Sequence, residues 1–382
     1  MGFHEFSSPY DWSRIAAYKR TAKAAFGGMI DLSVGSPVDP VPDSVRKALA
    51  VAANDPNAYG YPATAGTADL RAAIAEWFSA ARNVDLQAIH ADVVPTVGSK
   101  EGVALMASLL HFGEDDVVVQ PKVSYPTYEI GTQLAGAQVL KVDDVADVAS
   151  WRNVPGVKAV WVNSPCNPTG EVYSAERMAG IVAAAREIGA VVLSDECYAL
   201  MQWRGATNSA DDDPLQSTPC ALRSDVCAGS AEGVLVLYSL SKQSNMAGYR
   251  TAFIAGDESL IASMSAYRKQ IGQIIPGPVQ AAMAAGLRDL ESVKVQHARY
   301  RERLGVLVSA LRAYGYCTDM PDGALYVWAR AKSGDCWTDM EQLAKIGIIA
   351  SPGEFYGAPE CLRFSATASD EAIASAAERL AR

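Results

Sequence analysis

The sequence predicts an α/β protein in which a mostly parallel, seven-stranded sheet flanked by helices is joined to a smaller α+β domain. Between residues 91 and 257, short β-rich runs alternate with longer helical ones, which is typical of strands connected by crossover helices. After Gly315 the pattern changes to short strands and a terminal helix. The chain of 382 residues is long enough for two domains of about 150 residues or more each.

The strands of the sheet are predicted from short apolar runs bounded by turn-forming residues. They are expected at 92–97, 116–120, 138–142, 157–163, 190–194, 233–238 and 251–255. Helices are expected between them at 99–112, 126–135 and 174–189. The last of these has Ser174 as its N-cap and ends at Gly189, because serine caps helix starts and glycine suits helix ends.

The second half of the chain is richer in helix. The stretch from Leu260 to Tyr314 is interrupted by Pro-Gly-Pro at 276–278 and is predicted to contain one long helix over 286–313. The smaller domain is then expected to contain strands at 324–330, 347–350 and 361–365 and a terminal helix at 370–381.

The domain boundaries follow from the change in pattern at each end. The first 45 residues lie outside the repeating pattern and are expected to pack against the smaller domain. We therefore predict a large domain over 46–285 and a small domain formed by 1–45 and 286–382. The polar segment 204–232 is long for a loop, and long loops inside a domain are usually functional or mobile.

Composition restricts the partners and the compartment. Acidic residues outnumber basic ones, 43 to 33, which gives a net charge of −10 and argues against nucleic acid or an anionic membrane as a partner. The seven cysteines are scattered without a C-x-x-C pair, so neither a disulfide framework nor a thiolate metal site is indicated. No secretory signal is visible, and the apolar runs are shorter than the ~20 residues of a membrane span. These features favour the cytoplasm.

The most informative segment is YSLSKQSNMAGYR at 238–250, which follows an apolar strand. The hydroxyls of Ser239 and Ser241 and the guanidinium of Arg250 can surround a phosphate. Lys242 then lies beside that anion, where desolvation lowers the pKa of a lysine and lets it attack a carbonyl to form a Schiff base. The alternative is a surface loop with a solvated lysine.

Two further motifs follow predicted strands, at the sheet edge where α/β proteins bind ligands. They are SPCNPTG at 164–170 and SDECYAL at 194–200. An ionised Asp195 can pair with a protonated pyridine nitrogen, and Asn167 and Tyr198 can donate to a phenolate oxygen on the same ring. A plain turn and a helix cap are the alternatives for these motifs taken singly.

Three weaker signals complete the candidate site. Ser99 and Lys100 begin a helix after a strand, and helix N-termini bind phosphate. Tyr125 precedes a proline and can stack on a flat ring, although simple packing is the alternative. Arg363 lies on a short apolar strand, so its charge needs a partner, either a substrate carboxylate or a structural salt bridge.

The order of these motifs closely resembles the pyridoxal-phosphate-dependent aminotransferases of class I, fold type I, over nearly the whole chain. The resemblance rests on YPATAG, VGSK, SYPTY, NSPCNPTG, SDECY, SLSK with an arginine eight residues after the lysine, and LRFS. It implies that Lys242 holds the cofactor and moves the proton, and that Asp195 pairs with the ring nitrogen. It also implies that Arg363 binds the substrate α-carboxylate, with Gly35 and Asn167 as further substrate contacts. It also implies a homodimer in which Tyr61 reaches the neighbouring subunit's cofactor phosphate. The remaining implied cofactor contacts are Ser99, Lys100, Tyr125, Asn167, Tyr198, Ser239, Ser241 and Arg250.

A narrower resemblance is to the actinobacterial succinyldiaminopimelate aminotransferases, seen in DLSVGSPVDPVP, YGYPATAGTADLR and the segment 225–257. It implies transfer of an amino group between glutamate and N-succinyl-2-amino-6-oxopimelate. Class I transamination of aspartate, alanine, aromatic amino acids or unsubstituted diaminopimelate is the alternative, and a β-lyase or decarboxylase on the same fold is a rival. A regulator with an aminotransferase-like domain would need a DNA-binding segment, and no basic N-terminal extension is visible to supply one.

Overall fold

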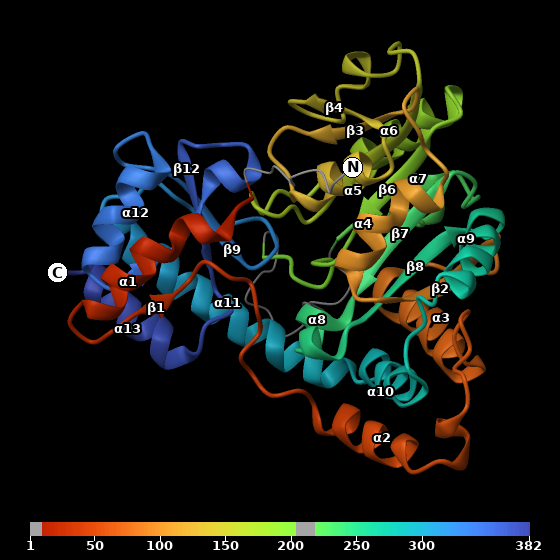
Figure 1. Cartoon of the computed structure of the whole chain (residues 1–382), viewed down its shortest axis with the longest axis horizontal. Helices are drawn as coiled ribbons and strands as arrows, with labels where there is room; N and C mark the ends of the chain where they lie inside the picture. Colours follow the sequence, from red (N-terminus) through yellow and green to blue (C-terminus); the bar gives the residue numbers. More distant parts are fainter. Residues whose placement is uncertain (1–9, 204–217) are drawn as a thin grey trace, which may run out of the picture.

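A seven-stranded sheet forms the centre of the larger part of the molecule in the computed structural model, which describes residues 10–203 and 218–382 (Figure 1). Along the sheet the strands are β2 (Ala91–Val97), β8 (Thr251–Asp257), β7 (Val234–Ser239), β6 (Val191–Asp195), β5 (Val157–Asn163), β3 (Val117–Pro121) and β4 (Gln138–Val142). Every neighbouring pair is parallel except those that β8 forms with β2 and β7. The predicted fold class is confirmed, and each predicted strand lies within two residues of an observed one.

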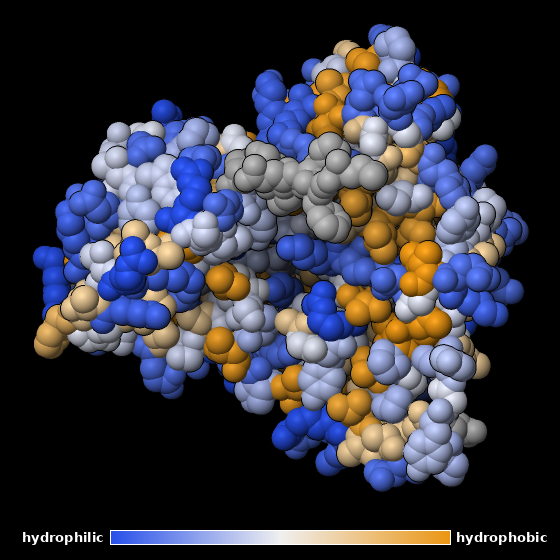
Figure 2. All heavy atoms as spheres, viewed as in Figure 1, coloured by the Kyte–Doolittle hydropathy of each residue, from blue (hydrophilic) through white to orange (hydrophobic). Residues whose placement is uncertain are grey.

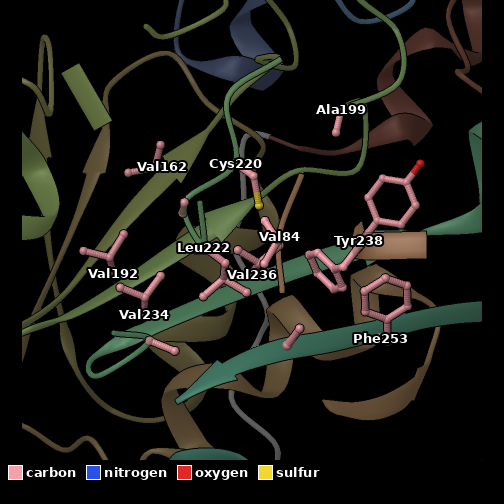
Figure 3. Close-up of a cluster of buried hydrophobic side chains, with 14 of the residues drawn as sticks. Val84, Val162, Val192, Ala199, Cys220, Leu222, Val234, Val236, Tyr238 and Phe253 are labelled. Carbon is pink, nitrogen blue, oxygen red and sulfur yellow. The ribbon is translucent and has the colours of Figure 1, made fainter. Parts of the chain in front are cut away.

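Both faces of this sheet are buried, which explains why its strands are almost continuously apolar. Along β7, Val234, Val236 and Tyr238 point to one face (Figure 3), while Leu235 and Leu237 belong to the cluster on the other face. The first face is covered by α3 (Ala68–Arg82), α6 (Ala175–Glu187), α7 (Ser224–Cys227) and α10 (Gly277–Arg288). The second face is covered by α4 (Ser99–Leu109), α5 (Thr127–Leu134) and α9 (Glu258–Gln270).

The helix ends predicted from the sequence agree with the observed helices, with one exception. The Ser174 hydroxyl accepts a hydrogen bond from the Arg177 N–H, and Gly189 has φ +71° after the end of α6. The prediction of one helix over 286–313 is wrong at its start, because 286–288 belong to α10 and α11 spans Leu290–Ala313. Asp289 separates the two helices: its backbone is not helical, and its carboxylate accepts from the Ser292 N–H and the Ser44 hydroxyl.

The smaller domain is built on a three-stranded antiparallel sheet. Its strands are β11 (Ser351–Pro352), β12 (Cys361–Ser365) and β9 (Tyr326–Arg330). The helices of this domain are α1 (Ala16–Ala24), α12 (Cys336–Lys345) and α13 (Asp370–Leu380). The N-terminal segment contributes β1 (Ile30–Asp31), which pairs in parallel with β10 (Ile348–Ile349).

Residues 32–42 connect β1 to α2 (Asp43–Ala53), which packs on α10. The predicted domain boundaries fall within α2 and α10, and the division at these positions stays a prediction. Of the polar segment 204–232, residues 204–217 lie outside the described part of the chain. Among the described residues, no helix combines the length and apolarity that crossing a membrane requires.

Candidate active site

The candidate site lies at one edge of the large sheet, where the register brings distant segments together. Asn163 and Asp195 end the parallel strands β5 and β6 side by side. Because β8 runs antiparallel to its neighbours, its first residues meet the last residues of β2 and β7, and Val97 pairs with Thr251. The edge borders a cleft of about 370 Å³, and the molecular surface is hollowed between the larger and smaller parts (Figure 2).

All of the predicted site residues except Tyr61 line this cleft. Tyr61 is fully exposed and does not belong to it. The structure therefore brings together residues that are up to 328 positions apart in the chain, from Gly35 to Arg363. Within the described residues, no group of three or more His, Cys, Asp and Glu side chains is arranged to hold a metal ion.

One end of the cleft is a cradle of donors suited to a phosphate. The Ser239 and Ser241 hydroxyl oxygens lie 2.7 Å apart, and α4 begins at Ser99, just after the end of β2. Arg250 follows a short turn of helix and reaches the backbone of Val97 and Gly98. Gly98 has φ +81°, and a Cβ there would collide with the Arg250 guanidinium. Hydroxyls, backbone N–H groups and a guanidinium are the donors that phosphate prefers.

Lys242 projects into the middle of the cleft from α8 (Leu240–Gln243). Its ammonium donates a hydrogen bond to the Gly35 carbonyl, which belongs to the connection between β1 and α2. Desolvation lowers the pKa of Lys242 from its ordinary value, and the nearby Arg363 and Arg250 cations act in the same direction. A lowered pKa favours the unprotonated amine, which is the form of a lysine that acts as a nucleophile and base.

A buried carboxylate forms the floor of the cleft. Asp195 accepts from the Tyr128 hydroxyl at 2.8 Å and from the Cys197 N–H at 3.1 Å, and burial raises the pKa of this carboxyl. Asn163 fixes the floor by donating to the Asp195 carbonyl and accepting from the Asn167 N–H. A carboxylate held this way can pair with a protonated ring nitrogen, which would offset the cost of its burial.

The opposite wall is formed by Arg363 on β12. Its guanidinium donates to Asn167 Oδ1 at 2.7 Å and to the Ser33 carbonyl at 2.9 Å. Arg363 is 4% exposed, and its Nε–H has no hydrogen-bond partner among the described residues. A buried guanidinium N–H without a partner is costly, so the site is suited to a carboxylate that would accept from it.

Tyr326 is a site residue that the sequence reasoning missed. Its hydroxyl lies 2.7 Å from the Tyr198 hydroxyl, and a Cβ at Gly35 would collide with the Tyr326 oxygen. Burial alone would raise the pKa of Tyr326, but the Arg363 and Lys242 cations outweigh burial and lower it. The pairing of 324–330 with 361–365 was the available signal, because the observed register puts Tyr326 opposite Ser365, two residues from Arg363. Tyr10, Trp12 and Cys197 also line the cleft and were not predicted.

Comparisons with known proteins agree with this geometry. The family model described as aminotransferase class I and II matches residues 27–380. The 4-dedimethylamino-4-oxo-anhydrotetracycline transaminase OxyQ of Streptomyces rimosus is 40% identical, with 97% of this chain and 98% of that protein covered. A probable aminotransferase of Mycobacterium tuberculosis is also 40% identical, covering 97% of this chain and 84% of that protein. A probable N-succinyldiaminopimelate aminotransferase of Thermus thermophilus has a similar solved structure, with a TM-score of 0.82, 27% identity, and 97% and 99% of the two chains covered.

Fold and site together define a transaminase of fold type I. The chain belongs to the class I and II aminotransferase family, whose members use amino acids and 2-oxo acids as substrates. Its cofactor is pyridoxal phosphate. The donor cradle, the buried Asp195 and the desolvated Lys242 match the phosphate, the ring nitrogen and the aldehyde of that cofactor.

Proposed function

We propose that the protein transfers the amino group of glutamate to N-succinyl-2-amino-6-oxopimelate, as a succinyldiaminopimelate transaminase of lysine and diaminopimelate synthesis. Amino transfer rests on one observation above all, the desolvated Lys242 between a phosphate-type cradle and a buried carboxylate. The solved structure from Thermus thermophilus, with the name it carries, supports the choice of acceptor.

In this proposal each of the main residues in the cleft has one role. Pyridoxal phosphate supplies an electron sink when it is bound. Lys242 holds it through its ε-amino group and, once displaced by substrate, carries the proton to and from the substrate α-carbon. Asp195 keeps the ring nitrogen protonated, and Arg363 binds the substrate α-carboxylate beside Gly35. The proposed cofactor contacts are Ser99, Tyr125, Asn167, Tyr198, Ser239, Ser241 and Arg250.

The role of Lys242 is tested by Lys242→Ala. We expect the variant to lose turnover and the visible absorbance of the bound cofactor together, because no other lysine is proposed to hold the cofactor. Borohydride reduction followed by peptide mapping checks the link directly. Recovery of a reducible, lysine-linked cofactor from the variant would assign the role to another residue.

A dicarboxylate substrate needs a second cation, and Lys100 is a candidate for it. Three of the cations that line the cleft, Lys242, Arg250 and Arg363, have other proposed partners. The Lys100 ammonium instead lies 5.6 Å from the centre of the Tyr10 ring, on the N-terminal segment that borders the cleft. Glutamate and the succinylated acceptor both carry a carboxylate beyond the α position, which an ammonium at this place would attract.

Lys100→Met separates this role from the phosphate contact that the family resemblance implies. If Lys100 binds the distal carboxylate, kcat/KM should fall about tenfold or more for glutamate, as expected for a lost charge-assisted hydrogen bond, and kcat/KM for alanine should stay unchanged. If Lys100 binds the phosphate, the affinity for the cofactor should fall, and kcat/KM should fall equally for glutamate and alanine. Lys122→Met, an exposed ion-paired lysine outside the cleft, is the matched control.

A second candidate acceptor is a ring ketone, because the Streptomyces rimosus relative is 40% identical along nearly the whole chain and its name states such a substrate. A coupled assay with glutamate and a panel of acceptors decides between the two. The panel should contain the succinylated oxopimelate, oxaloacetate, pyruvate, an aromatic 2-oxo acid and a polycyclic ketone. Preference for the ketone over every 2-oxo acid would replace our first proposal.

We further propose a homodimer in which Tyr61 reaches the phosphate of the neighbouring site, working in the cytoplasm. The exposure of Tyr61 together with Tyr59, two residues away, supports the dimer, since large apolar side chains that are gathered in water mark an interface. The cysteines, all of them free, support a reducing compartment.

A further inference from the structure

The hydroxyl of Tyr326 connects the smaller domain to the cofactor side of the cleft. Tyr326 lies on β9, whereas Tyr198 follows β6 of the large sheet, and their hydroxyl oxygens are 2.7 Å apart. Both side chains are buried, at 2% and 7% exposure, so water does not compete for this contact.

The position of Tyr326 is fixed on two sides. Its ring lies against the Arg363 guanidinium, whose central carbon is 3.9 Å from the ring centre. Its hydroxyl lies against the backbone of Gly35, where an added Cβ would collide with the hydroxyl oxygen. A phenol that cannot turn away must direct its hydrogen to an acceptor that is present, and the Tyr198 oxygen is the acceptor at hydrogen-bond distance.

We propose that Tyr326 is a positioning residue for amino transfer: it donates to the Tyr198 hydroxyl, and so leaves the hydrogen of Tyr198 free for the ring oxygen of the cofactor. The inference rests on the proposed placement of the cofactor on Lys242 with its ring oxygen at Tyr198.

The partners available to the two hydroxyls support this direction. In the proposed arrangement the Tyr198 hydroxyl has the ring oxygen of the cofactor as an acceptor, whereas the Tyr198 oxygen is the acceptor at hydrogen-bond distance from Tyr326. A hydroxyl that accepts becomes a stronger donor in turn. The titratable groups that face Tyr326 are Cys197, Tyr198, Lys242, Tyr300, Tyr356 and Arg363.

The test is a pH titration of the visible band of the bound cofactor in the holoenzyme, without turnover. Tyr198 should stabilise the ring oxygen as an anion, which is the form present when the lysine-linked nitrogen has lost its proton. We therefore expect Tyr326→Phe to move the midpoint to higher pH by about half a unit or more, the size of one modest hydrogen bond. In a Tyr198→Phe background the same substitution should move the midpoint no further.

Tyr356→Phe is the matched control. It also removes a buried hydroxyl beside Arg363, whose central carbon lies 4.7 Å from the Tyr356 ring, but that hydroxyl contacts Ser351 instead of Tyr198. Its midpoint should stay at the wild-type value. Phe keeps the ring of either tyrosine in place, so both variants retain the packing of the cleft.

Each other result is decisive. An unmoved midpoint in Tyr326→Phe overturns the inference, as does a shift of equal size in the Tyr198→Phe background. A shift to lower pH would show that Tyr326 acts as a charge on Lys242, and it overturns the proposed donor direction. If the wild-type enzyme showed no titrating visible band at all, the proposed role of Lys242 would fail instead.

Discussion

Arg363 combines a charge, full burial and an unused donor in one side chain. Two of its nitrogen atoms are held by Asn167 and the Ser33 carbonyl, which fixes the plane of the guanidinium before any substrate arrives. The Nε–H is left without a partner among the described residues. Preorganisation of this kind favours a planar, two-oxygen ligand over a single anionic oxygen.

Arg363→Lys therefore keeps the positive charge and removes the planar set of N–H donors that can bind both oxygens of a carboxylate. We expect kcat/KM to fall for every amino-acid substrate by about 2 kcal/mol in transition-state stabilisation, the milder end of the range for a truncated buried charge pair. The visible band of the bound cofactor should be unchanged. Steady-state kinetics with glutamate and alanine check this, since both present the same α-carboxylate. If kcat/KM falls for only one of these two substrates, Arg363 binds a part of the substrate other than the α-carboxylate.

At the residue scale, sequence reasoning found the groups that follow strands and missed those that approach from the other domain. Lys242, Asp195 and Asn167 lie directly after predicted strands, so the topology of a parallel sheet brought them to one edge. Tyr326 lies on β9 of the smaller sheet, and its hydroxyl meets Tyr198, which follows β6 of the larger one. That contact depends on the three-dimensional packing of two sheets, which no local pattern encodes.

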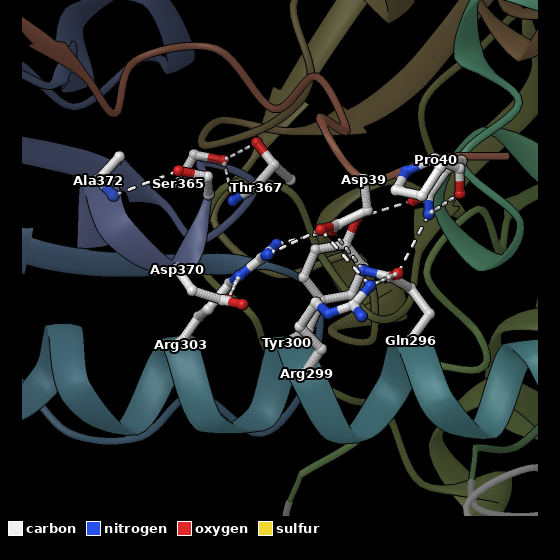
Figure 4. A network of polar contacts seen from close by, with 12 residues as sticks. Asp39, Pro40, Gln296, Arg299, Tyr300, Arg303, Ser365, Thr367, Asp370 and Ala372 are labelled. Carbon is white, nitrogen blue, oxygen red and sulfur yellow. Dashed lines mark hydrogen bonds and ion pairs between the residues drawn. The ribbon is translucent and has the colours of Figure 1, made fainter. Parts of the chain in front are cut away.

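At the element scale, residues 33–42 are held to α11 by a network centred on Asp39 (Figure 4). Arg303 donates to both Asp39 oxygens, at 2.7 and 2.8 Å, and Gln296 donates to one of them. Gln296 also accepts from Asn245, which follows the helix that carries Lys242. The network thus ties Gly35 and Lys242, which hydrogen bond to each other, to the same helix.

Asp39→Asn should destabilise the fold by about 1–3 kcal/mol at pH 7, because it leaves the buried Arg303 with a weaker partner. Burial alone would raise the pKa of Asp39, but hydrogen bonds from Arg303 and Gln296 lower it. Its contribution is therefore complete above the unfolded pKa of about 3.9 and is lost as the pH falls through the lower folded value. Urea unfolding should show a constant difference from wild type between pH 5 and 8, and a shrinking one below about pH 4.

Asp370→Asn is the control for this network. Asp370 also pairs with Arg303, at 2.6 Å, but its side chain is 66% exposed. Its removal should cost less than about 1 kcal/mol. Equal losses for the two variants would mean that the network stabilises the fold through Arg303 alone and that the connection at Asp39 contributes little.

One helix boundary could not be predicted from the local sequence. The residues around 286–288 suit a helix, so the local pattern predicts a helix that continues into α11. The break at Asp289 is fixed by the Ser44 hydroxyl of α2, which lies far away in the sequence. The strands were predictable because burial on both faces leaves an apolar run bounded by turn residues, a signal that is local.

At the scale of the whole molecule, the proposed dimer makes each site depend on two chains. Lys242 lines the cleft of its own chain, while Tyr61 is fully exposed and outside it. If Tyr61 completes the phosphate cradle of the neighbour, a defect at Tyr61 in one chain and a defect at Lys242 in the other fall in the same site of a mixed dimer. One site then carries both defects and the other carries none.

Co-expression of Tyr61→Ala and Lys242→Ala chains tests this dependence. In random pairing half of the dimers are mixed, and each has one intact site, so activity should recover to about one quarter of wild type. Purification through two different tags should isolate the mixed dimers at about half of the wild-type activity per dimer. Mixing the two purified parents without exchange of subunits is the control, and it should give only the sum of their residual activities. Mixed dimers that are no more active than that sum would mean that Tyr61 serves its own chain or no site at all, and the proposed sharing of the cofactor cradle would have to be given up.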